Sequence, residues 1–304
     1  MAFAAKNVAK FIESDLPSIN LDNLLRVWLS QLIDNAMQGK PTYVEVRLYA
    51  KGANGFDVVD NGCGFTQSQL AVLCKCMPTR ERNEIYKVKS IGFQGEALNS
   101  LCKSSKVTIT TKHNDEPTGL KVKFNTKGEL ISLEPVEMQT SGSLVEVREI
   151  FRNNFPYKNR FRKNIHCQFD NAMRILTSYS LIMINTVFHV TNGFSSFAKN
   201  GELMNDDDVE EECFATEDLT TLFTTTAPGM WFKNCKTILH RCFRKPFPGM
   251  TDHLVEFSIN LHGGMIHIDF ICTRPARGKK GMLAPRSFQL FLNNRPSGGP
   301  RRLR

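Results

Sequence analysis

The 304-residue sequence predicts an α+β fold in two domains, residues 1–200 and 201–304, the second cut short by the end of the chain. Three observations lead to this expectation. One long segment repeats apolar residues at helical spacing, several short segments alternate apolar and polar residues, and the composition changes near residue 200. The length fits roughly 100–200 residues per domain. With 41% hydrophobic and 23% charged residues, the composition is globular.

The first domain is expected to open with a helix that Asn20 caps and that runs to about Gln38. Its buried face would carry the apolar residues at helical spacing, Leu21, Leu24, Leu25, Trp28, Leu32 and Ile33. Alternation then predicts strands over residues 43–49, 56–59, 107–111, 120–124 and 144–147. A long helical stretch is expected from Phe161 through Ile182.

The second domain is expected to follow an acidic run at residues 206–212, which predicts an exposed loop or linker. Residues 255–260 and 265–272 are predicted to pair as strands across Gly263-Gly264. A basic loop at residues 274–280 precedes a last predicted strand at residues 288–292.

Charge and cysteine content narrow the classes of protein. The net charge of +9 favours an anionic partner, nucleic acid first. No apolar run reaches the roughly 18–20 residues that span a bilayer, and Lys6 comes too early for a secretory signal. Nine scattered cysteines, with Cys74 and Cys76 lacking further ligands nearby in the sequence, favour reduced thiols over a zinc site or a disulfide framework.

The first of three candidate motifs is Gln31-Leu32-Ile33-Asp34-Asn35 on the long helix. Gln31 and Asn35 are four residues apart and therefore share a helix face. The Asn35 carbonyl oxygen suits Mg²⁺, which bridges phosphates well. Taken alone, the motif is more simply explained as a polar stripe on an amphipathic helix.

The second motif, Asp60-Asn61-Gly62-Cys63-Gly64-Phe65, follows a predicted buried strand. Asp60 can accept a hydrogen bond from an adenine amino group, and Gly62 and Gly64 let the backbone approach a flat base. A simple turn between strands is the alternative.

The third motif is Gly92-Phe93-Gln94-Gly95-Glu96-Ala97-Leu98, where glycines open a helix. Backbone N–H groups and the positive end of the helix dipole would bind phosphate there. The segment differs from the Walker pattern because no Gly-Lys-Ser/Thr follows.

In this order the three motifs resemble the nucleotide-binding motifs of the GHKL ATPases, the class of gyrase, Hsp90 chaperones, histidine kinases and MutL. Gly92–Leu98 is similar to the Gly-Phe-Arg-Gly-Glu-Ala-Leu signature of MutL mismatch repair proteins. Three further stretches resemble MutL motifs: Ser141-Gly142-Ser143-Leu144-Val145, the segment from Phe151 to Phe161 with Phe155-Pro156-Tyr157-Lys158, and Phe291-Leu292-Asn293-Asn294-Arg295-Pro296. The eukaryotic post-meiotic-segregation branch is the most similar.

The resemblance implies a Bergerat-type α/β sandwich followed by a smaller, ribosomal-protein-like α+β domain. It implies ATP and Mg²⁺ as cofactors, with Asn35 as the magnesium ligand, and an ATP-ordered lid. It also implies a MutL-family dimer partner and a nuclear location, with a cytoplasmic one as the alternative; the lack of a long apolar run adds the expectation of no membrane association. We expect no nuclease chemistry in these residues. The nucleotide-binding residues that it implies are Asn35, Asp60, Gly62, Gly64, Thr79, Gly92, Phe93, Gln94, Gly95, Glu96, Ala97, Leu98, Ser143 and Arg301.

The sequence departs from the family at the position of the general base, where Gln31 stands in place of the expected Glu. A carboxamide orients water but does not take its proton. Asp34, one turn away, is a weaker candidate for that role. In the lid, Glu81 stands where a phosphate-facing Lys is expected, and Gln94 replaces the signature Arg. We therefore predict an ATP binder with slow or absent hydrolysis.

Two groups of basic residues predict a DNA-binding groove with strongly salt-dependent affinity, as in MutL proteins. They are Arg152, Lys158, Arg160, Arg162 and Lys163, and Arg274, Arg277, Lys279 and Lys280. Solvated faces without a ligand are the alternative. The leading hypothesis is an ATP-driven conformational switch in mismatch repair. The competitors are a degenerate MutL paralogue that acts as a partner-interaction module, and a chaperone-like or chromatin GHKL ATPase.

Overall fold

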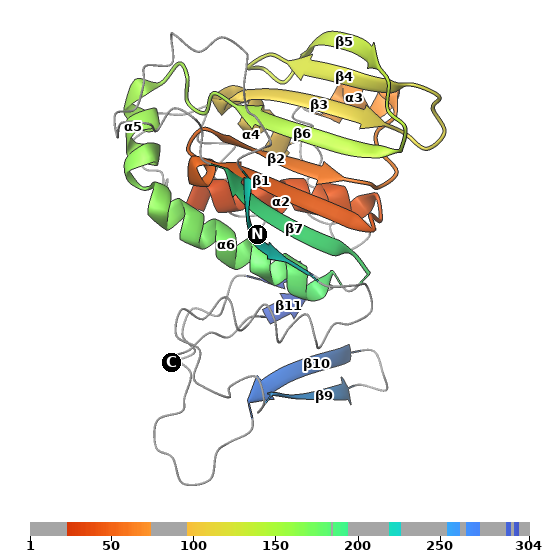
Figure 1. Ribbon diagram of the computed structural model, residues 1–304, viewed down its shortest axis with the longest axis vertical. Coiled ribbons are helices and arrows are strands. Elements are labelled where there is room, and N and C mark those ends of the chain that lie inside the picture. Colours follow the sequence, from red (N-terminus) through yellow and green to blue (C-terminus); the bar gives the residue numbers. More distant parts are fainter. Residues whose placement is uncertain are drawn as a thin grey trace. The chain divides into compact units, whose positions relative to one another are not determined.

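An eight-stranded sheet forms the first unit of the chain, in the order β5-β4-β3-β6-β2-β1-β7-β8 (Figure 1). The computed structural model describes residues 23–73, 96–183, 185–193, 219–225, 254–261, 266–273, 290–292 and 295–297. The strands of this sheet are β1 (Tyr43–Tyr49), β2 (Gly55–Asp60), β3 (Lys106–Lys112), β4 (Gly119–Phe124), β5 (Leu130–Val136), β6 (Gly142–Arg148), β7 (Val187–Gly193) and β8 (Leu219–Thr224). All neighbours are antiparallel except β1 and β7, which run parallel.

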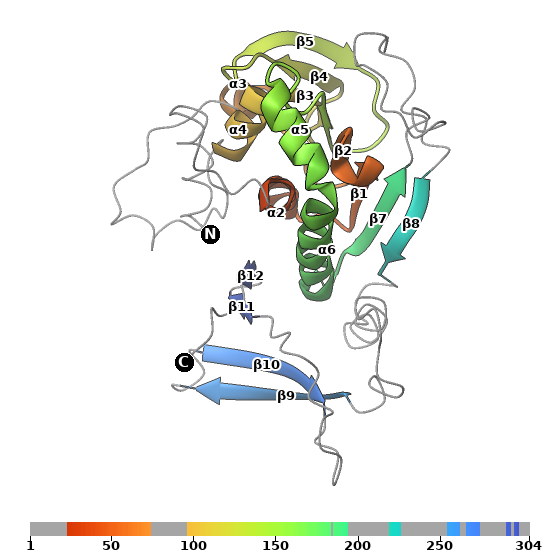
Figure 2. The same cartoon turned by 90° about the vertical axis from the view of Figure 1, so that its left-hand side faces the viewer.

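Helix α2 (Leu24–Gln38) packs on β2 and on α4 (Glu96–Ser104), on one face of the sheet (Figure 2). The described helix begins at Leu24 with Asn23 in the N-cap position, so the predicted cap Asn20 lies outside the described residues. The face of α2 predicted to be apolar is buried: Leu24, Leu25, Trp28, Leu32 and Ile33 are each 2% exposed or less.

Aromatic rings fill the centre of this layer. The Trp28 ring lies 6.4 Å from that of Phe56, 6.1 Å from Phe151 and 6.2 Å from Phe161. Phe56 comes from β2, whereas Phe161 comes from α5 (Phe155–Lys163). The cluster therefore joins α2, the sheet and α5 into one core, with offset ring pairs that each contribute roughly 0.5–1.5 kcal/mol beyond their buried area.

The long helix predicted from Phe161 is two helices, α5 and α6 (Ile165–Ile182), separated at Asn164. Helix α5 begins six residues earlier than predicted because Asn154 caps it: its Oδ1 accepts a hydrogen bond from the Tyr157 N–H at 3.3 Å. Pro156 in the first turn fits the same start. Helix α6 lies against the start of α2, where buried Gln168 Oε1 accepts from the Leu25 N–H.

Five predicted strands are confirmed with bounds shifted by a residue or two, whereas β5, β7 and β8 were not predicted. Strand β8 pairs with β7 and belongs to the first sheet although it lies beyond residue 200. By contact, the described residues up to Leu176 and from Asn185 to Thr224 form one compact unit.

The second unit comprises the described residues from Thr177 to Met183 and those from Thr225 onward. Within it, β9 (Leu254–Leu261) and β10 (Ile266–Thr273) pair antiparallel, which confirms the predicted hairpin. Strand β11 (Leu290–Leu292) pairs with β12 (Arg295–Ser297). Whether these hairpins belong to a ribosomal-protein-like domain stays a prediction. Across the described stretches of both units, no helix is long and apolar enough to cross a membrane.

Candidate functional site: the turn after strand β2

The turn after β2 carries a half-buried carboxylate, Asp60. The Gly62 N–H donates to Asp60 Oδ1 at 2.8 Å, so one oxygen is occupied and Oδ2 is left for another donor. Burial raises the pKa of Asp60 to about 6, while the Gly62 hydrogen bond acts in the opposite direction. A desolvated carboxylate gains more from a new donor than a solvated one does, and this suits the exocyclic amino group of adenine.

The glycines of this turn are required by their surroundings. Gly64 has a φ of +70°, and a Cβ there would lie 2.1 Å from the Lys112 carbonyl oxygen. At Gly62 an added Cβ would lie 2.9 Å from both Asp60 Oδ1 and the Gly39 oxygen. The glycines therefore let this turn pack against the backbone on either side of it, and the predicted approach to a flat base stays a prediction.

A row of polar side chains crosses three strands beside Asp60. Ser143 on β6 is the register partner of Asp60, and Thr111 on β3 is the partner of Ser143. Thr111 Oγ1 donates to the Gly142 carbonyl at 2.8 Å and accepts the Phe65 N–H at 3.0 Å. Because its single proton is used in this way, Ser143 Oγ donates to Thr111 Oγ1 across 3.0 Å. Ser143, 4% exposed, thus has free acceptor capacity next to Asp60.

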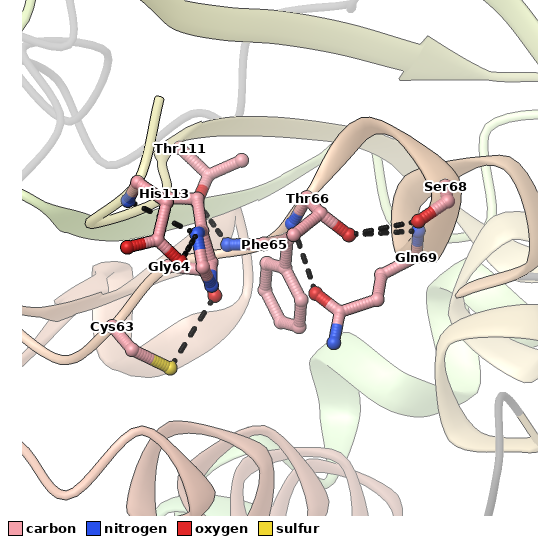
Figure 3. Close-up of polar contacts among 9 residues, drawn as sticks. Cys63, Gly64, Phe65, Thr66, Ser68, Gln69, Thr111 and His113 are labelled. Carbon is pink, nitrogen blue, oxygen red and sulfur yellow. Dashed lines mark hydrogen bonds and ion pairs between the residues drawn. The ribbon is translucent and has the colours of Figure 1, made fainter. Parts of the chain in front are cut away.

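Figure 3 shows how Thr111 holds the turn. Phe65 reaches Thr111 through its N–H, and the chain then enters α3 (Gln67–Leu73). Thr66 and Gln69 form a reciprocal cap: the Thr66 N–H donates to Gln69 Oε1 at 2.9 Å, and the Gln69 N–H donates to Thr66 Oγ1 at 3.3 Å. The turn is therefore fixed at both ends.

Asn61 ties the turn to the start of β1, a role the sequence reasoning missed. Its Oδ1 accepts from the Thr42 and Tyr43 N–H groups at 2.9 and 2.8 Å, and its Nδ2 donates to Thr42 Oγ1 at 2.8 Å. The Cys63 N–H also donates to the Gly39 oxygen at 3.1 Å. Helix α2, which carries the first motif, is thereby joined to the loop that carries the second.

On α2 the structure places Gln31 and Asn35 one turn apart, both half-buried, between the fully buried positions Leu32, Ile33 and Ala36. Asp34, the weaker candidate for the base, is also half-buried and is already engaged in an interaction of its own. A half-buried polar pair on a helix that packs against β2 is compatible with either a ligand-facing stripe or a solvated one, so the roles of Gln31 and Asn35 remain predictions.

The third motif is described only in part. Glu96, Ala97 and Leu98 form the first turn of α4, and Leu98 is 1% exposed. The other predicted phosphate-binding residues, Thr79, Gly92, Phe93, Gln94 and Gly95, lie outside the described residues, as does Arg301. Glu81 lies there too.

The predicted DNA-binding residues separate into two kinds. Arg152, Arg160 and Lys163 are exposed on or just before α5, and Lys158 is half-buried. Arg162 is half-buried; its Nη2 donates to Asn54 Oδ1 at 3.5 Å, and burial lowers its pKa. Arg162 therefore contacts the protein itself rather than standing in solvent. The second basic group, Arg274, Arg277, Lys279 and Lys280, lies outside the described residues.

On the opposite face of the sheet lies a buried charge cluster that the sequence did not indicate. Asp57, 3% exposed, accepts from Tyr49 Oη at 2.7 Å and pairs with Arg148 Nη1. The Arg148 guanidinium also lies 4.7 Å from the Tyr49 ring centre. Burial and the neighbouring Asp57 raise the pKa of Tyr49. This cluster braces β1, β2 and β6, the strands that position Asp60 and Ser143.

The comparisons with known proteins agree with the geometry. Residues 25–149 match the family model of the histidine kinase-, DNA gyrase B- and HSP90-like ATPases. The DNA mismatch repair protein PMS1 of Arabidopsis thaliana is 29% identical over 168 residues, 54% of this chain and 18% of that protein. The mismatch repair endonuclease pms1 of Dictyostelium discoideum is 30% identical over 165 residues, 53% of this chain and 16% of that protein. The chain thus spans less than a fifth of either relative.

A solved structure shares the fold. The ATPase domain of Aquifex aeolicus MutL complexed with ADP superimposes with a TM-score of 0.53 at 18% identity, and covers 90% of this chain and 82% of that one. These matches and the strand order confirm the predicted α/β sandwich.

Proposed function

Because this chain carries a GHKL ATPase domain of the MutL mismatch repair type, we propose that it binds ATP at the turn after β2 and works as a slowly hydrolysing conformational switch. The observation that carries the proposal is the desolvated Asp60, with Oδ2 available, beside buried Ser143 and the close-packed glycines. Adenine would donate its amino group to Asp60 Oδ2, and the backbone at Gly62 and Gly64 would lie against the base.

Asn35 suits the magnesium site because its amide oxygen is a hard ligand on a half-buried helix position. In the described part of the chain, no three His, Cys, Asp or Glu side chains gather to hold a metal. Asn35 would hold the ion close to the nucleotide phosphates, in keeping with the few protein ligands that Mg²⁺ commonly takes. Bound there, the ion would supply charge neutralisation at the phosphates.

Gln31 sets the rate of hydrolysis in this proposal. Its side chain can hold the attacking water by a hydrogen bond but has no site for the proton that the water loses. A missing general base lowers the rate by roughly 10²–10⁴-fold. The chain would then spend most of its cycle with ATP bound, which favours a long-lived closed state over rapid turnover.

The test is steady-state hydrolysis by the chain beside Gln31→Glu, with Mg²⁺ and saturating ATP. We expect the variant to be about 10²-fold faster or more. Gln31→Ala serves as the control, since it removes the side chain without supplying a base and should gain nothing. A Gln31→Glu variant no faster than the wild type would contradict the role given to this position. If both then turned over at an ordinary rate, Asp34 would be the next candidate.

We also propose that the chain binds DNA through α5 and pairs with a second MutL-family chain in the nucleus. The net charge of +9 and the exposed Arg160 and Lys163 support DNA binding. Replacing these two by Ala should weaken binding and reduce the slope of log affinity against log salt by about 2. The matched control is Lys121→Ala with Lys123→Ala, two half-buried lysines on β4. Equal losses from both pairs would argue against a localised groove.

The second candidate function is a degenerate paralogue that serves as a partner-interaction module, and Gln31 is the observation that favours it. The two functions differ in nucleotide binding. An ATP-dependent rise in thermal stability supports the switch, whereas a chain indifferent to ATP and ADP supports the module.

A further inference from the structure

An exposed aromatic ring stands among the basic residues of α5. The outward positions of this segment are Arg152, Phe155, Asn159, Arg160 and Lys163, which we call the basic face of α5; all five are exposed. Phe155 is 69% exposed, and it and Ile131, at 64%, are the most exposed of the large hydrophobic side chains in the described residues. Phe155, Asn159 and Lys163 recur every four residues and form one stripe along the helix, which Arg160 borders, and Arg152 lies in the turn before the helix.

The ring of Phe155 is not needed for the core. Helix α5 is anchored by Phe161, 1% exposed, whose ring lies 5.8 Å from Phe151 and 6.2 Å from Trp28. Tyr157 adds a second contact, with its ring 5.9 Å from Phe151. These inward contacts, together with the Asn154 cap, fix the first turn and so hold Phe155 outward in a defined position.

The charge along α5 itself has one sign. The α5 sequence, Phe155 to Lys163, contains no acidic residue. Arg160 and Lys163 follow Phe155 along the stripe. Arg152 precedes it and is bound to Glu149, with Nη1 at 2.7 Å from Oε2, so its charge is partly offset. An exposed ring between cations matches a ligand that has flat apolar faces and a negative backbone.

We propose that the basic face of α5 binds single-stranded nucleic acid, with one base stacked on Phe155 and the adjoining phosphates beside Arg160 and Lys163. The proposal rests on the DNA binding proposed above and specifies its form. Bases of a single strand are free to stack on an aromatic side chain. In an intact duplex they are paired and stacked already, and a wedge between them costs a few kcal/mol. An apolar protein partner fits less well, since the other exposed residues of the basic face of α5, Asn159, Arg160 and Lys163 among them, are polar or charged.

The test compares the affinities of the full chain for a fluorescent oligo(dT) and for a duplex of equal length. Phe155→Ala should weaken oligo(dT) binding by about 10-fold, within the range of one base–aromatic stack, and leave the duplex affinity unchanged. Phe155→Tyr should keep the wild-type affinity because it keeps the ring. Ile131→Ala is the matched control, since it removes an equally exposed apolar side chain on the edge strand β5. Neither Phe155 variant should alter the salt dependence, which belongs to the cations.

A second variant reports the contact directly. Phe155→Trp should show fluorescence quenching on adding oligo(dT), and circular dichroism of each variant checks that α5 is intact. Unchanged oligo(dT) affinity in Phe155→Ala, or equal weakening of both DNA forms, would overturn the stacking proposal while leaving DNA binding in place. If the wild-type chain bound neither form, the broader proposal of DNA binding would fall with it. Loss of affinity for an acidic protein, with DNA affinity unchanged, would identify a protein-docking face instead.

Discussion

Asp60→Asn should make the nucleotide-free chain more stable and unable to use ATP. In the native fold the pKa of Asp60 is raised from its ordinary value of 3.8 to about 6 because burial penalises the charged form. The folded chain therefore binds more protons than the unfolded chain between these values, and its stability falls as pH rises through that window. Above about pH 6 the penalty is complete and stays constant.

At roughly 1.4 kcal/mol per pH unit, the shift corresponds to about 3 kcal/mol at neutral pH. Asp60 keeps some solvent exposure, and screening reduces this figure to about 1–3 kcal/mol. Asparagine carries no charge, so the variant does not pay this penalty. It also keeps an oxygen for the Gly62 N–H, which preserves the local hydrogen bond. The substitution changes the other side-chain atom, Oδ2, from a carboxylate oxygen that accepts hydrogen bonds to an NH₂ group that donates them.

The assay is urea unfolding of the wild type and Asp60→Asn at pH 4.5, 6 and 7.5, with and without ATP. Without nucleotide, the free energy of unfolding of the variant should rise relative to that of the wild type as pH rises. The difference should level off above pH 6. With ATP only the wild type should be stabilised further, because two donors would face each other in the variant. Parallel pH dependences of the two proteins would refute the buried-carboxylate reasoning. Equal stabilisation by ATP would refute its role in binding adenine.

Three other substitutions test the scaffold around the site. Gly64→Ala should abolish ATP-induced stabilisation and lower the free energy of unfolding by more than the roughly 1–2 kcal/mol of left-handed strain alone, because Cβ would collide with the Lys112 oxygen; nucleotide binding equal to wild type would contradict this. Arg148→Met leaves the buried Asp57 charge unpaired, and urea unfolding should show a loss of about 3–5 kcal/mol, partly recovered when Asp57→Asn is added. Asn61→Ala removes three hydrogen bonds between the turn and the start of β1, so hydrogen exchange should speed up at residues 42–43 and not in β4.

The sequence predicted the elements whose pattern is local. The alternation in residues 43–49 and the buried face of α2 depend only on neighbours a few residues away, and both are present. Strand β5 was not predicted because it is a half-exposed edge strand that contains Pro135, and its apolar and polar residues do not alternate regularly. The start of α5 was missed because its first two residues, Phe155 and Pro156, are exposed and do not belong to the buried face that continues to Phe161.

In the candidate site, too, residues in local motifs were predicted, and residues that depend on distant strands were not. Asp60, Gly62, Gly64 and Ser143 were predicted from motifs, and the register of β2 on β6 brings Asp60 opposite Ser143. Thr111 was not predicted, because its place in the row depends on how β3 pairs with β6, some thirty residues away along the chain. Asp57 and Arg148 were missed for a similar reason, since their pairing depends on strands far apart in sequence. Residues that act through cross-strand register are recognised only once the sheet is known.

The parallel pairing of β1 with β7 has a consequence for how the protein is made. Tyr43 pairs with Val187, about 140 residues later, and β8 closes that edge only at Thr224. At about 5–20 residues per second, a ribosome needs roughly 7–30 s to deliver β7 after β1 has been synthesised. During that interval one side of β1 offers unpaired backbone groups to any strand within reach. Truncating the chain before β7 would make this temporary exposure permanent, so we expect such fragments to require chaperones or to aggregate.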